Sequence, residues 1–478
     1  MIAVILALLI VPAAAGLLCF ALPAQVSPAV TVVSGLASFA LVLALVPAAA
    51  HQNLSYLTYL RVDAVSAIFL LATGFLYAAV AVYAVGYLKG HHDRHLYAGL
   101  NLFAWSMLAA PMMSSLALLW IAVELTTIIS ALLVAIEDTD GAAEAAWKYV
   151  LIASAGLGLA LLGTVVAYYA GSQVLGEHYN LGIEPLLIAG ARLPHTPVRL
   201  AFLLALLGYG TKVGFFPVHT WLPDAHSEAP TPVSALLSGS LLAVSFYAIL
   251  RFYQVAAVTL GSGFPRDALL AFGVASLLLA ALYVFGQQDI KRLLAYSSVE
   301  HMGILAIGVS FGAPVALAGV MLHVLAHAAA KGNAFMGAGV FTVKFGTKQI
   351  SAIRGGLDLL PWSGPLFLLA VFALSALPPS GIFRSEFQIV AGGFDSGSYA
   401  AAAVLIIGVT VAFFGLTAST TSMLFISTPG AQARSEPSPW MVVPVVAGVA
   451  VLFVLGLHPP AELTGLISRA VTQLAVTR

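Results

Sequence analysis

The chain is built from long apolar runs that alternate with short polar stretches. A run of about 20 apolar residues can cross the hydrocarbon core of a bilayer as a helix. Runs near this length occupy residues 3–22, 29–48, 65–88, 96–110, 112–136, 149–170, 199–216, 232–256, 267–286, 293–311, 314–341, 364–394, 400–426 and 438–458. The pattern therefore predicts an all-α integral membrane protein with about fourteen transmembrane helices. The longest connection covers residues 172–198, so we expect a single transmembrane domain, residues 1–478, without an inserted soluble domain.

The first apolar run is expected to be a retained helix rather than a signal peptide. Neither Lys nor Arg precedes its apolar core, and equally long apolar runs continue to the end of the chain. The Lys and Arg residues of alternate loops show only a slight bias, so the sequence does not fix the orientation in the membrane.

Proline interrupts two of the runs in a similar way. The segment GYGTKVGFFPVHTWLPDAH contains Pro217 and Pro223, and the segment LSALPPSGIFRSEF, roughly 160 residues later, contains Pro378 and Pro379. Proline removes a backbone donor and clashes with the preceding turn, so unwound backbone at this depth must be buried in protein or line a wet cavity. Interrupted helices in matching positions of two halves indicate an internal repeat with an ion path at its centre. Two ordinary proline kinks are the alternative.

The composition narrows the class of protein. Only 8% of the 478 residues are charged and 61% are hydrophobic, which excludes an ordinary soluble enzyme. Nineteen Lys plus Arg balance nineteen Asp plus Glu, so no basic excess supports a nucleic-acid partner. The one cysteine, Cys19, excludes a disulfide framework, a four-thiolate iron–sulfur cluster and a cysteine-based zinc site. We therefore expect no cofactor, and any redox chemistry is expected to belong to a partner.

Glu124 and Lys212 are the first two charges that need an explanation. Glu124 lies near the middle of LALLWIAVELTTIISALLVAI, and Lys212 follows the apolar stretch AFLLALLGYGT. A charge at mid-membrane costs about 2.5–3.5 kcal/mol even on a lenient insertion scale. The bland alternatives are a protonated Glu124 that bonds a hydroxyl such as Thr126 or Thr127, and a Lys212 that snorkels to an interface. The functional interpretation is a switchable acid–base pair on an ion path.

A third group of ionisable residues is His323, His327 and Lys331 in LHVLAHAAAKGNAF. Their spacing of four places them on one stripe of a helix, with neighbours about 6 Å apart along the axis. The stripe suits proton relay, because imidazole exchanges protons near neutral pH and a buried lysine readily loses its charge. Histidines that bond across a helix contact are the alternative. No metal site is predicted, because the stripe lacks an HExxH glutamate and no third ligand lies nearby in the sequence.

Acidic and histidine residues also follow each break. Glu386 lies two residues after Arg384, so an outlet for protons and a local Arg–Glu pair are both open. The loop expected after the first break concentrates four polar residues, His219, Asp224, His226 and Glu228. Those four are either solvated loop residues or a funnel through which protons enter.

The motifs around these residues are similar to a known family. The segments VELTTIISALLV, EAAWKYVLIASAGLGLALLGT, HTWLPDAHSEAPTPVSALLSG, QQDIKRLLAYSSVEHMGILAIG, LHVLAHAAAKGNAF and ALPPSGIFRSEF resemble the antiporter-like proton-pumping subunits of respiratory complex I. More narrowly, the chain resembles the membrane protein called component F in hydrogenase-4 and formate hydrogenlyase-type complexes. The resemblance covers roughly residues 60 to 430.

The resemblance implies a fold of fourteen helices with two inverted five-helix repeats and with broken helices seven and twelve. It divides the chain into N-terminal helices (1–95), a first repeat (96–256), a second repeat (267–426) and a C-terminal helix (438–478).

Site roles also follow from the resemblance. Glu124 and Lys212 match an ion pair between helices five and seven, and Glu386 matches the terminal ionisable residue of helix twelve. The remaining relay positions of helix eleven are matched by His323, His327 and Lys331. One position departs from many complex I relatives, which have a lysine on the eighth helix where this chain has Ala243. Because alanine cannot titrate, the central relay must rest on the other side chains and on water.

The resulting hypothesis is a non-catalytic, proton-translocating subunit of a larger oxidoreductase complex. Its expected partners are the lipid bilayer, protons, other antiporter-like and membrane-anchor subunits, and peripheral hydrogenase-like or iron–sulfur subunits. Its expected location is a prokaryotic-type cytoplasmic membrane. The alternatives are a subunit of a multi-subunit sodium/proton antiporter, a subunit of an inorganic-carbon uptake system, and a structural membrane arm that conducts nothing.

Overall fold

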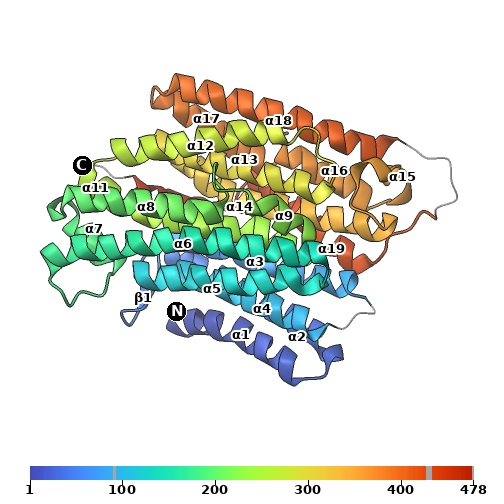
Figure 1. Cartoon of the computed structure of the whole chain (residues 1–478), viewed down its shortest axis with the longest axis horizontal. Coiled ribbons are helices and arrows are strands. Elements are labelled where there is room, and N and C mark those ends of the chain that lie inside the picture. Colours follow the sequence, from blue (N-terminus) through green and yellow to red (C-terminus); the bar gives the residue numbers. More distant parts are fainter. Residues whose placement is uncertain (90–92, 427–432, 476–478) are drawn as a thin grey trace.

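The computed structural model describes residues 1–89, 93–426 and 433–475, and this part of the chain is almost entirely helical. Figure 1 shows the long helices lying side by side along the length of the molecule. The α-helices are α1 (Ile2–Ala21), α2 (Ser27–Ala49), α3 (Ala64–Tyr87), α4 (Arg94–Ala109), α5 (Leu116–Val134), α6 (Asp140–Leu175), α7 (Ile183–Ala189), α8 (His195–Val213), α9 (Trp221–Glu228), α10 (Thr231–Leu236), α11 (Leu242–Leu260), α12 (Gly263–Tyr283), α13 (Ile290–Phe311), α14 (Pro314–Phe345), α15 (Gly356–Leu359), α16 (Ser363–Leu374), α17 (Gly381–Asp395), α18 (Tyr399–Phe425), α19 (Pro439–Leu457) and α20 (Ala461–Leu474).

Eleven helical segments within the described residues are long and apolar enough to cross a membrane. The predicted membrane class is therefore confirmed, whereas the predicted number of spans exceeds this count by three. Run 96–110 forms α4, which has only 16 residues, and run 364–394 is divided into α16 and α17, of 12 and 15 residues. Run 199–216 forms α8, which ends at a break and carries Lys212 in its last turn. Short, broken or charged helices fall below a hydropathy criterion even when they lie inside the bundle.

Three local features differ from the sequence prediction. Helix α6 has 36 residues rather than the 22 of run 149–170, because its polar first turns are capped by Thr139, whose side chain accepts a hydrogen bond from the Ala142 backbone N–H. The expected C-terminal helix is two helices, α19 and the amphipathic α20, with Pro459 and Pro460 between them; residues 476–478 of that prediction lie outside the described part. Strands β1 (Leu54–Tyr56) and β2 (Leu60–Val62) form an antiparallel hairpin that apolar periodicity did not indicate.

Both predicted helix interruptions are present. Helix α8 ends at Val213 and α9 begins at Trp221, and Gly214 takes the left-handed conformation (φ +85°) that ends α8. Helix α16 ends at Leu374 and α17 begins at Gly381. The backbone thus unwinds at each of the two proline-containing segments, next to the charged residues that the sequence singles out.

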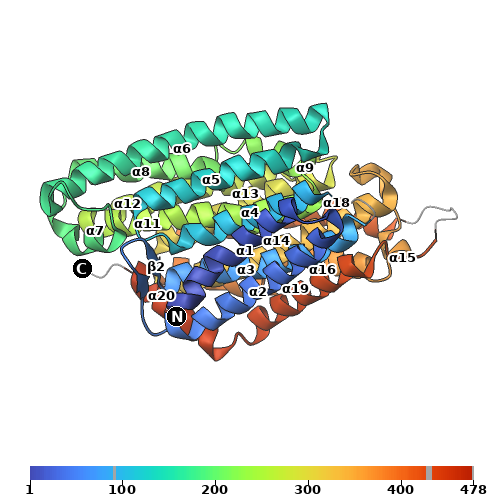
Figure 2. The ribbon, with the colours of Figure 1, turned by 90° about the horizontal axis from the view of Figure 1, so that it is seen from below.

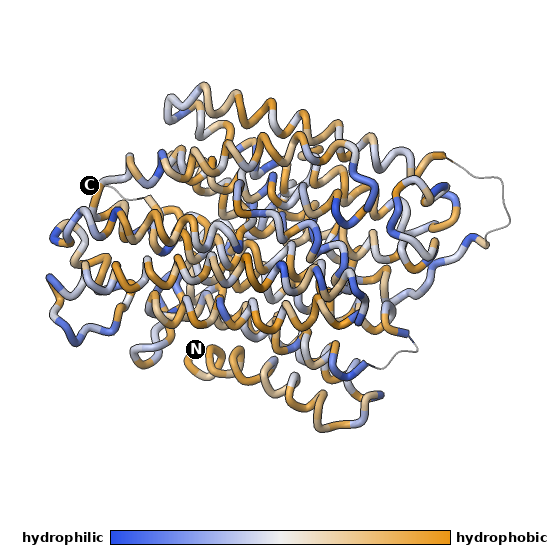
Figure 3. Tube along the Cα trace, viewed as in Figure 1, coloured by the Kyte–Doolittle hydropathy of each residue, from blue (hydrophilic) through white to orange (hydrophobic). Residues whose placement is uncertain are grey.

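The helices that carry most of the ionisable residues lie in the interior of the bundle. In their most apolar stretch, all residues of Thr231–Leu260 and Ile290–Phe311 and 89% of those of Pro314–Phe345 are buried. The corresponding share is only 33% for the peripheral helices α1, α12 and α18. In the view of Figure 2, α13 and α14 lie between α6 on one side and α19 on the other. Figure 3 shows hydrophilic segments inside the otherwise hydrophobic bundle as well as at its ends.

A buried ion pair between Asp63 and Arg251 joins distant parts of the chain at one end of the bundle. Arg251 on α11 donates to Asp63 Oδ1 at 2.6 Å, and Asp63 caps α3 by accepting a hydrogen bond from Ser66 N at 2.9 Å. Arg251 also donates to Gln254, whose side-chain amide donates to the backbone oxygen of Gln473 on α20, both at 2.8 Å. The network therefore holds the first turn of α3, helix α11 and the C-terminal helix together.

Replacing Asp63 with Asn is expected to lower the free energy of unfolding by about 3–5 kcal/mol, because it leaves the Arg251 guanidinium buried without a counter-charge. Burial alone disfavours the charged form of Asp63, but the neighbouring Arg251 outweighs burial and lowers the carboxyl pKa to about 2. Its stabilising contribution is therefore present above the ordinary aspartate pKa of about 3.9 and is lost as the pH falls through about 2. Denaturation in detergent micelles at neutral pH measures the loss.

The matched control for this prediction is Asp395→Asn, which changes an exposed aspartate at the end of α17. That variant should alter the free energy of unfolding by no more than about 0.5 kcal/mol. Equal stabilities of the two variants would mean that the Asp63–Arg251 pair does not hold these helices together.

Candidate functional site

Lys212 lies in a fully buried hydroxyl-lined site. Its ammonium donates to Thr127 Oγ1 on α5 at 2.6 Å and to the Tyr149 hydroxyl on α6 at 2.7 Å. The Tyr149 hydroxyl in turn lies 2.8 Å from Ser130 Oγ. Lys212 stands in the last turn of α8, where the partial negative charge of the helix end stabilises a cation. Because Lys212 is 0% exposed and bonded on both sides, the snorkelling alternative is wrong.

Glu124 is half-buried on α5 and bonds a hydroxyl on the next helix. Ser154 Oγ on α6 donates to Glu124 Oε1 at 3.2 Å, and Glu124 Oε2 is buried without a hydrogen-bond partner among the described residues. The expected hydroxyl partners have other partners, since Thr126 donates to the backbone oxygen of Val123 and Thr127 accepts from Lys212. In the described structure no carboxylate lies within 4.0 Å of Lys212, so the predicted Glu124–Lys212 pair is open here.

The stripe predicted on one helix is present in α14. His323, His327 and Lys331 are all 0% exposed, and the ring centroids of the two histidines lie 6.3 Å apart. Lys331 reaches the neighbouring helix, where its ammonium donates to the backbone oxygen of Leu294 on α13 at 2.9 Å. Both ring nitrogens of His327 are buried without a hydrogen-bond partner among the described residues. The stripe is therefore not simply a set of histidines satisfied by helix–helix hydrogen bonds.

His301 on α13 packs against both histidines of the stripe, although the sequence motifs did not single it out. Its ring centroid lies 5.2 Å from that of His323 and 5.3 Å from that of His327. Its Nδ1 lies 3.1 Å from His323 Nε2, within hydrogen-bond distance. The three rings form a cluster across two helices, which we call the histidine cluster (His301, His323 and His327).

The histidine cluster ends at Glu386 on α17, just after the second break. Glu386 Oε1 lies 3.8 Å from His301 Nδ1, and the preceding residue, Ser385, holds His323 Nδ1 at 2.9 Å through its hydroxyl. Arg384 points elsewhere, because its guanidinium donates to the backbone oxygens of Gly456 and Leu457 at 3.3 and 3.4 Å. The described structure therefore contains no Arg384–Glu386 pair, and that alternative is wrong.

The segment after the first break is a helix rather than the expected loop. Trp221, Leu222 and Ala225 are buried and fix α9, and Pro223 occupies its first turn, where a missing N–H costs little. His226 is accordingly 0% exposed, with Nδ1 2.8 Å from the backbone oxygen of Leu222. The solvated-loop interpretation of His226 is therefore wrong.

The other residues near the first break divide between the interior and the polar end of the bundle. His219 is buried and 6% exposed. Asp224 is half-buried and pairs with Arg292 at 2.9 Å, and Glu228 pairs with Lys348 at 2.7 Å. Glu228 and Lys348 also line an open polar pocket of about 440 Å³ together with Asp289 and Arg292. Asp224 and Glu228 thus stand where an aqueous surface meets the interior.

Two buried residues of α13, Glu300 and His301, carry a sequence signal that the motifs above leave out. They lie inside the apolar run AYSSVEHMGILAIG and are 2% and 0% exposed. The rule that singled out Glu124 and Lys212, that an ionisable residue in a membrane span needs a reason, applies equally to them. Tyr149, which bonds Lys212, carries no such signal because tyrosine is common in apolar runs.

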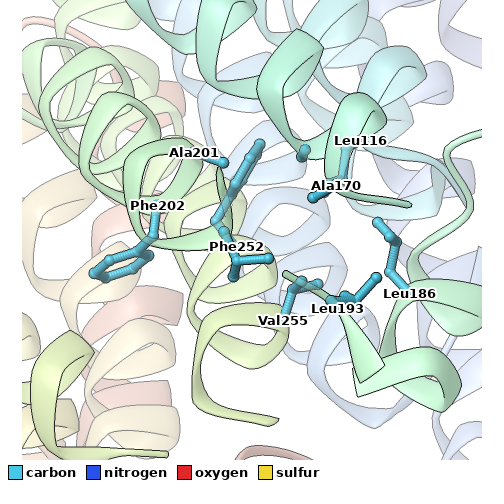
Figure 4. Close-up of a pocket in the computed structure, with 10 residues that line it drawn as sticks. Leu116, Ala170, Leu186, Leu193, Ala201, Phe202, Phe252 and Val255 are labelled. Atoms are coloured by element: carbon cyan, nitrogen blue, oxygen red, sulfur yellow. The ribbon is translucent and has the colours of Figure 1, made fainter. Parts of the chain in front are cut away.

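Side-chain chemistry also separates packing seams from candidate sites. The space bounded by Leu116, Ala170, Leu186, Leu193 and Phe252, among others, is lined by apolar side chains and has a volume of only about 10 Å³ (Figure 4). A void of this size without polar groups does not hold ordered water. By contrast, potential metal-ligand atoms of His301, His323 and Glu386 lie within 4.8 Å of one another.

Comparison with known proteins gives consistent similarities. Residues 113–415 match the family described as NADH:quinone oxidoreductase/Mrp antiporter, TM. The chain is 33% identical over 413 residues to the hydrogenase-4 component F homolog of Methylacidiphilum infernorum, covering 84% of this chain and 86% of that protein.

Two solved structures share the fold over nearly the whole chain. They are subunits of the membrane-bound sulfane sulfur reductase, an archaeal respiratory membrane complex (TM-score 0.88, 20% identity, 99% of this chain and 97% of that one), and of the Mrp complex from Dietzia sp. DQ12-45-1b (TM-score 0.85, 20% identity, 98% and 97%). At these identities the likeness shows the fold alone.

Proposed function

The chain belongs to the NADH:quinone oxidoreductase/Mrp antiporter transmembrane family, and from this premise we propose that it is a non-redox, proton-translocating subunit of a hydrogenase-4 or complex I-like membrane assembly. The observation that carries the proposal is the histidine cluster, which lies between the buried Lys331 on the same helix and Glu386 at the second break. Buried imidazoles at hydrogen-bond distance can accept a proton at one nitrogen and release it from the other. A purely structural arm has no need for such a group at this depth.

In the first half of the proposed path, Glu124 and Lys212 act as a switchable pair. Lys212 is held by Thr127 and Tyr149 in the described state, while Glu124 is held by Ser154. Both side chains are flexible and both partners are neutral hydroxyls, so closing the pair exchanges hydrogen bonds for an ion pair without stranding a charge. The closed pair would favour the charged lysine, and the open pair would favour release of its proton.

The path then has to cross from Lys212 to the stripe on α14 without a titratable group at Ala243. We assign this crossing to His226. Trp221, one turn before it on the face of α9, stacks near Tyr149 with ring centroids 4.4 Å apart, and His226 itself lies 5.5 Å from the ring of Phe335. Phe335 is one turn beyond Lys331 on α14, so His226 stands between the lysine sites of the two halves. Its Nε2 is buried and has no hydrogen-bond partner among the described residues, which leaves it free for a bridging water.

Protons would reach this path through the polar end of the bundle and leave beyond Glu386. Asp224 and Glu228 lie near the open polar pocket, and His219 stands between them and the interior as an inlet residue. The fold proposed for this path has fourteen helices with two inverted repeats, 96–256 and 267–426, each containing one of the two breaks. It also has N-terminal helices in 1–95 and a C-terminal part in 438–478.

The proposed setting is the cytoplasmic membrane of a prokaryote. There the chain would contact other antiporter-like and membrane-anchor subunits and would serve a peripheral hydrogenase-like or iron–sulfur unit. Mass spectrometry of co-purified proteins tests this placement. Small antiporter subunits instead of redox subunits would favour the second candidate, a sodium/proton antiporter, which the structural likeness to an Mrp complex supports.

Replacing Glu386 with Gln is expected to reduce proton release by about 100-fold, because an amide cannot take the proton offered by His301. Glu386→Asp keeps the acid and should retain part of the flux. The matched control is Arg384→Ala, which removes a neighbouring charge that bonds α19 and not Glu386. Proton flux into proteoliposomes containing the intact assembly measures all three variants. A larger loss in Arg384→Ala than in Glu386→Gln would remove Glu386 from the path.

A further inference from the structure

A set of metal-ligating atoms converges where the second half of the path ends. His301 from α13, His323 from α14 and Glu386 from α17 offer one nitrogen or oxygen each, all within 4.8 Å of one another. The side chains are 0%, 0% and 5% exposed. We propose that these three residues form a binding site for a transition-metal cation of the Zn²⁺ class, and that metal bound there blocks proton transfer. The binding stands on the geometry alone, whereas the block rests on the proposed function.

The spacing of the donor atoms fits a single small ion. His301 Nδ1 lies 3.1 Å from His323 Nε2 and 3.8 Å from Glu386 Oε1. At a Zn–N distance of about 2.0 Å, a tetrahedral arrangement separates two nitrogen ligands by about 3.3 Å. The two histidines therefore already stand at the separation that a shared zinc ion requires. Only the carboxylate has to move, by a fraction of an ångström.

The surroundings of His323 match those of a metal-binding histidine. Its other ring nitrogen, Nδ1, lies 2.9 Å from the Ser385 hydroxyl, which itself donates to the backbone oxygen of Ile382 at 2.8 Å. A hydrogen bond from Nδ1–H to such an acceptor fixes the tautomer that presents the Nε2 lone pair to the metal. The ring is thus oriented by its hydroxyl partner before any ion arrives.

Charge and space also suit a divalent cation. Two carboxylates, Glu386 and the adjacent buried Glu300 on α13, oppose its charge, and Glu300 Oε2 and Glu386 Oε1 have no hydrogen-bond partners among the described residues. Glu386 lines a groove of about 550 Å³ between the second break, α17 and α18, which leaves room for a water at a fourth position. A His₂Glu set with an open position is an established zinc ligand set.

Metal and protons would compete for the same lone pairs. In the proposed path, His301 and His323 pass a proton to Glu386 through these atoms, and a coordinated nitrogen or oxygen cannot accept it. The ion would also tie three helices together on either side of the second break. Bound metal should therefore act as an inhibitor of translocation rather than as a cofactor for it.

Zinc binding to the purified intact assembly, stripped of metal with a chelator, tests the site. We expect about one tightly bound zinc per copy of this chain, and Co²⁺ bound in its place should give the visible absorption of a four-coordinate site. His301→Asn and Glu386→Gln should each weaken binding by more than the roughly 10- to 100-fold that loss of a hydrogen-bond partner of a ligand costs. Ser385→Ala should weaken binding by about 10-fold while leaving all three ligands in place.

The control is His458→Ala, which removes an exposed histidine after α19 and should leave both zinc binding and proton flux unchanged. Melting curves in detergent confirm that each variant is folded. Absence of a tight site in the wild type, or equal affinity in His301→Asn, would overturn the proposed site. Zinc that binds a conducting wild type without slowing it would overturn the block alone. A wild type that binds zinc but conducts no protons would contradict the proposed function and leave the binding site standing.

Discussion

Replacing Lys212 with Met is expected to stop proton transfer while the complex stays assembled. The ammonium connects Thr127 and Tyr149 to the end of α8, and Met cannot carry a proton between them. Loss of a positioned acid–base group lowers proton-transfer rates by about 100- to 10,000-fold. Met has a similar length and no charge to desolvate, and Tyr149 keeps its contact with Ser130, so the fold should tolerate the change. Proton uptake into vesicles driven by an imposed membrane potential measures the effect.

A second substitution at the same position separates proton exchange from charge. Lys212→Arg keeps a positive charge but cannot release its proton, so it too should abolish uptake. Lys344→Met is the matched control, because Lys344 lies in the last turn of α14 and bonds only backbone and hydroxyl oxygens of residues 433 and 435. Normal uptake by Lys212→Arg would show that Lys212 supplies a fixed charge and does not exchange a proton.

Replacing His327 with Phe is expected to have an effect of the same size. His327 is the side chain between Lys331 on its own helix and His301 on α13, and its two nitrogens have no competing hydrogen bond among the described residues. Phe fills the space of the ring but offers neither a donor nor an acceptor. Because Ala243 offers no parallel route, we expect uptake to fall by about 100-fold or more.

Adding Ala243→Lys to His327→Phe is expected to restore part of this loss. Ala243 lies on α11 one turn after Gly239, whose Cα packs against Ala328 of α14, so a lysine there stands beside the relay helix. Restoration will be partial, because a buried lysine costs free energy and its neighbours must repack. Ala243→Leu in the same background is the control for size. Equal uptake by the wild type and by His327→Phe would show that the histidine cluster is packing, and would favour the structural-arm alternative.

The sequence alone was sufficient for the parts of the fold that local physics decides. Apolar runs near membrane length and proline-containing breaks are properties of one segment, and both correspond to observed helices and helix ends. The same reasoning was wrong for α9, where a polar run became a buried helix. Burial of Trp221 and Leu222 against other helices decides that segment, and no local pattern reports such contacts. The length of α6 was underestimated because its first turns are polar and are held by a cap.

The candidate site divides along the same line. A spacing of four placed His323, His327 and Lys331 on one face, because that relation lies within a single helix. His301 and Ser385 reach His323 from two other helices, and only the packing of α13, α14 and α17 brings them together. The sequence proximity of Arg384 and Glu386 was misleading for a related reason. Residues two apart on a helix do not face each other, so Arg384 bonds α19 while Glu386 faces His301.

Proton uptake by proteoliposomes that contain the intact assembly, driven by a potassium diffusion potential without added sodium, tests the central claim most directly. The wild type, Lys212→Met and His327→Phe are compared at equal incorporation with a pH-sensitive dye. If protons cross this chain through the buried lysines and the histidine cluster, the wild type takes up protons and both variants lose about 99% of that uptake. Equal uptake by all three proteins, or uptake by the wild type only when sodium is present, would contradict the account.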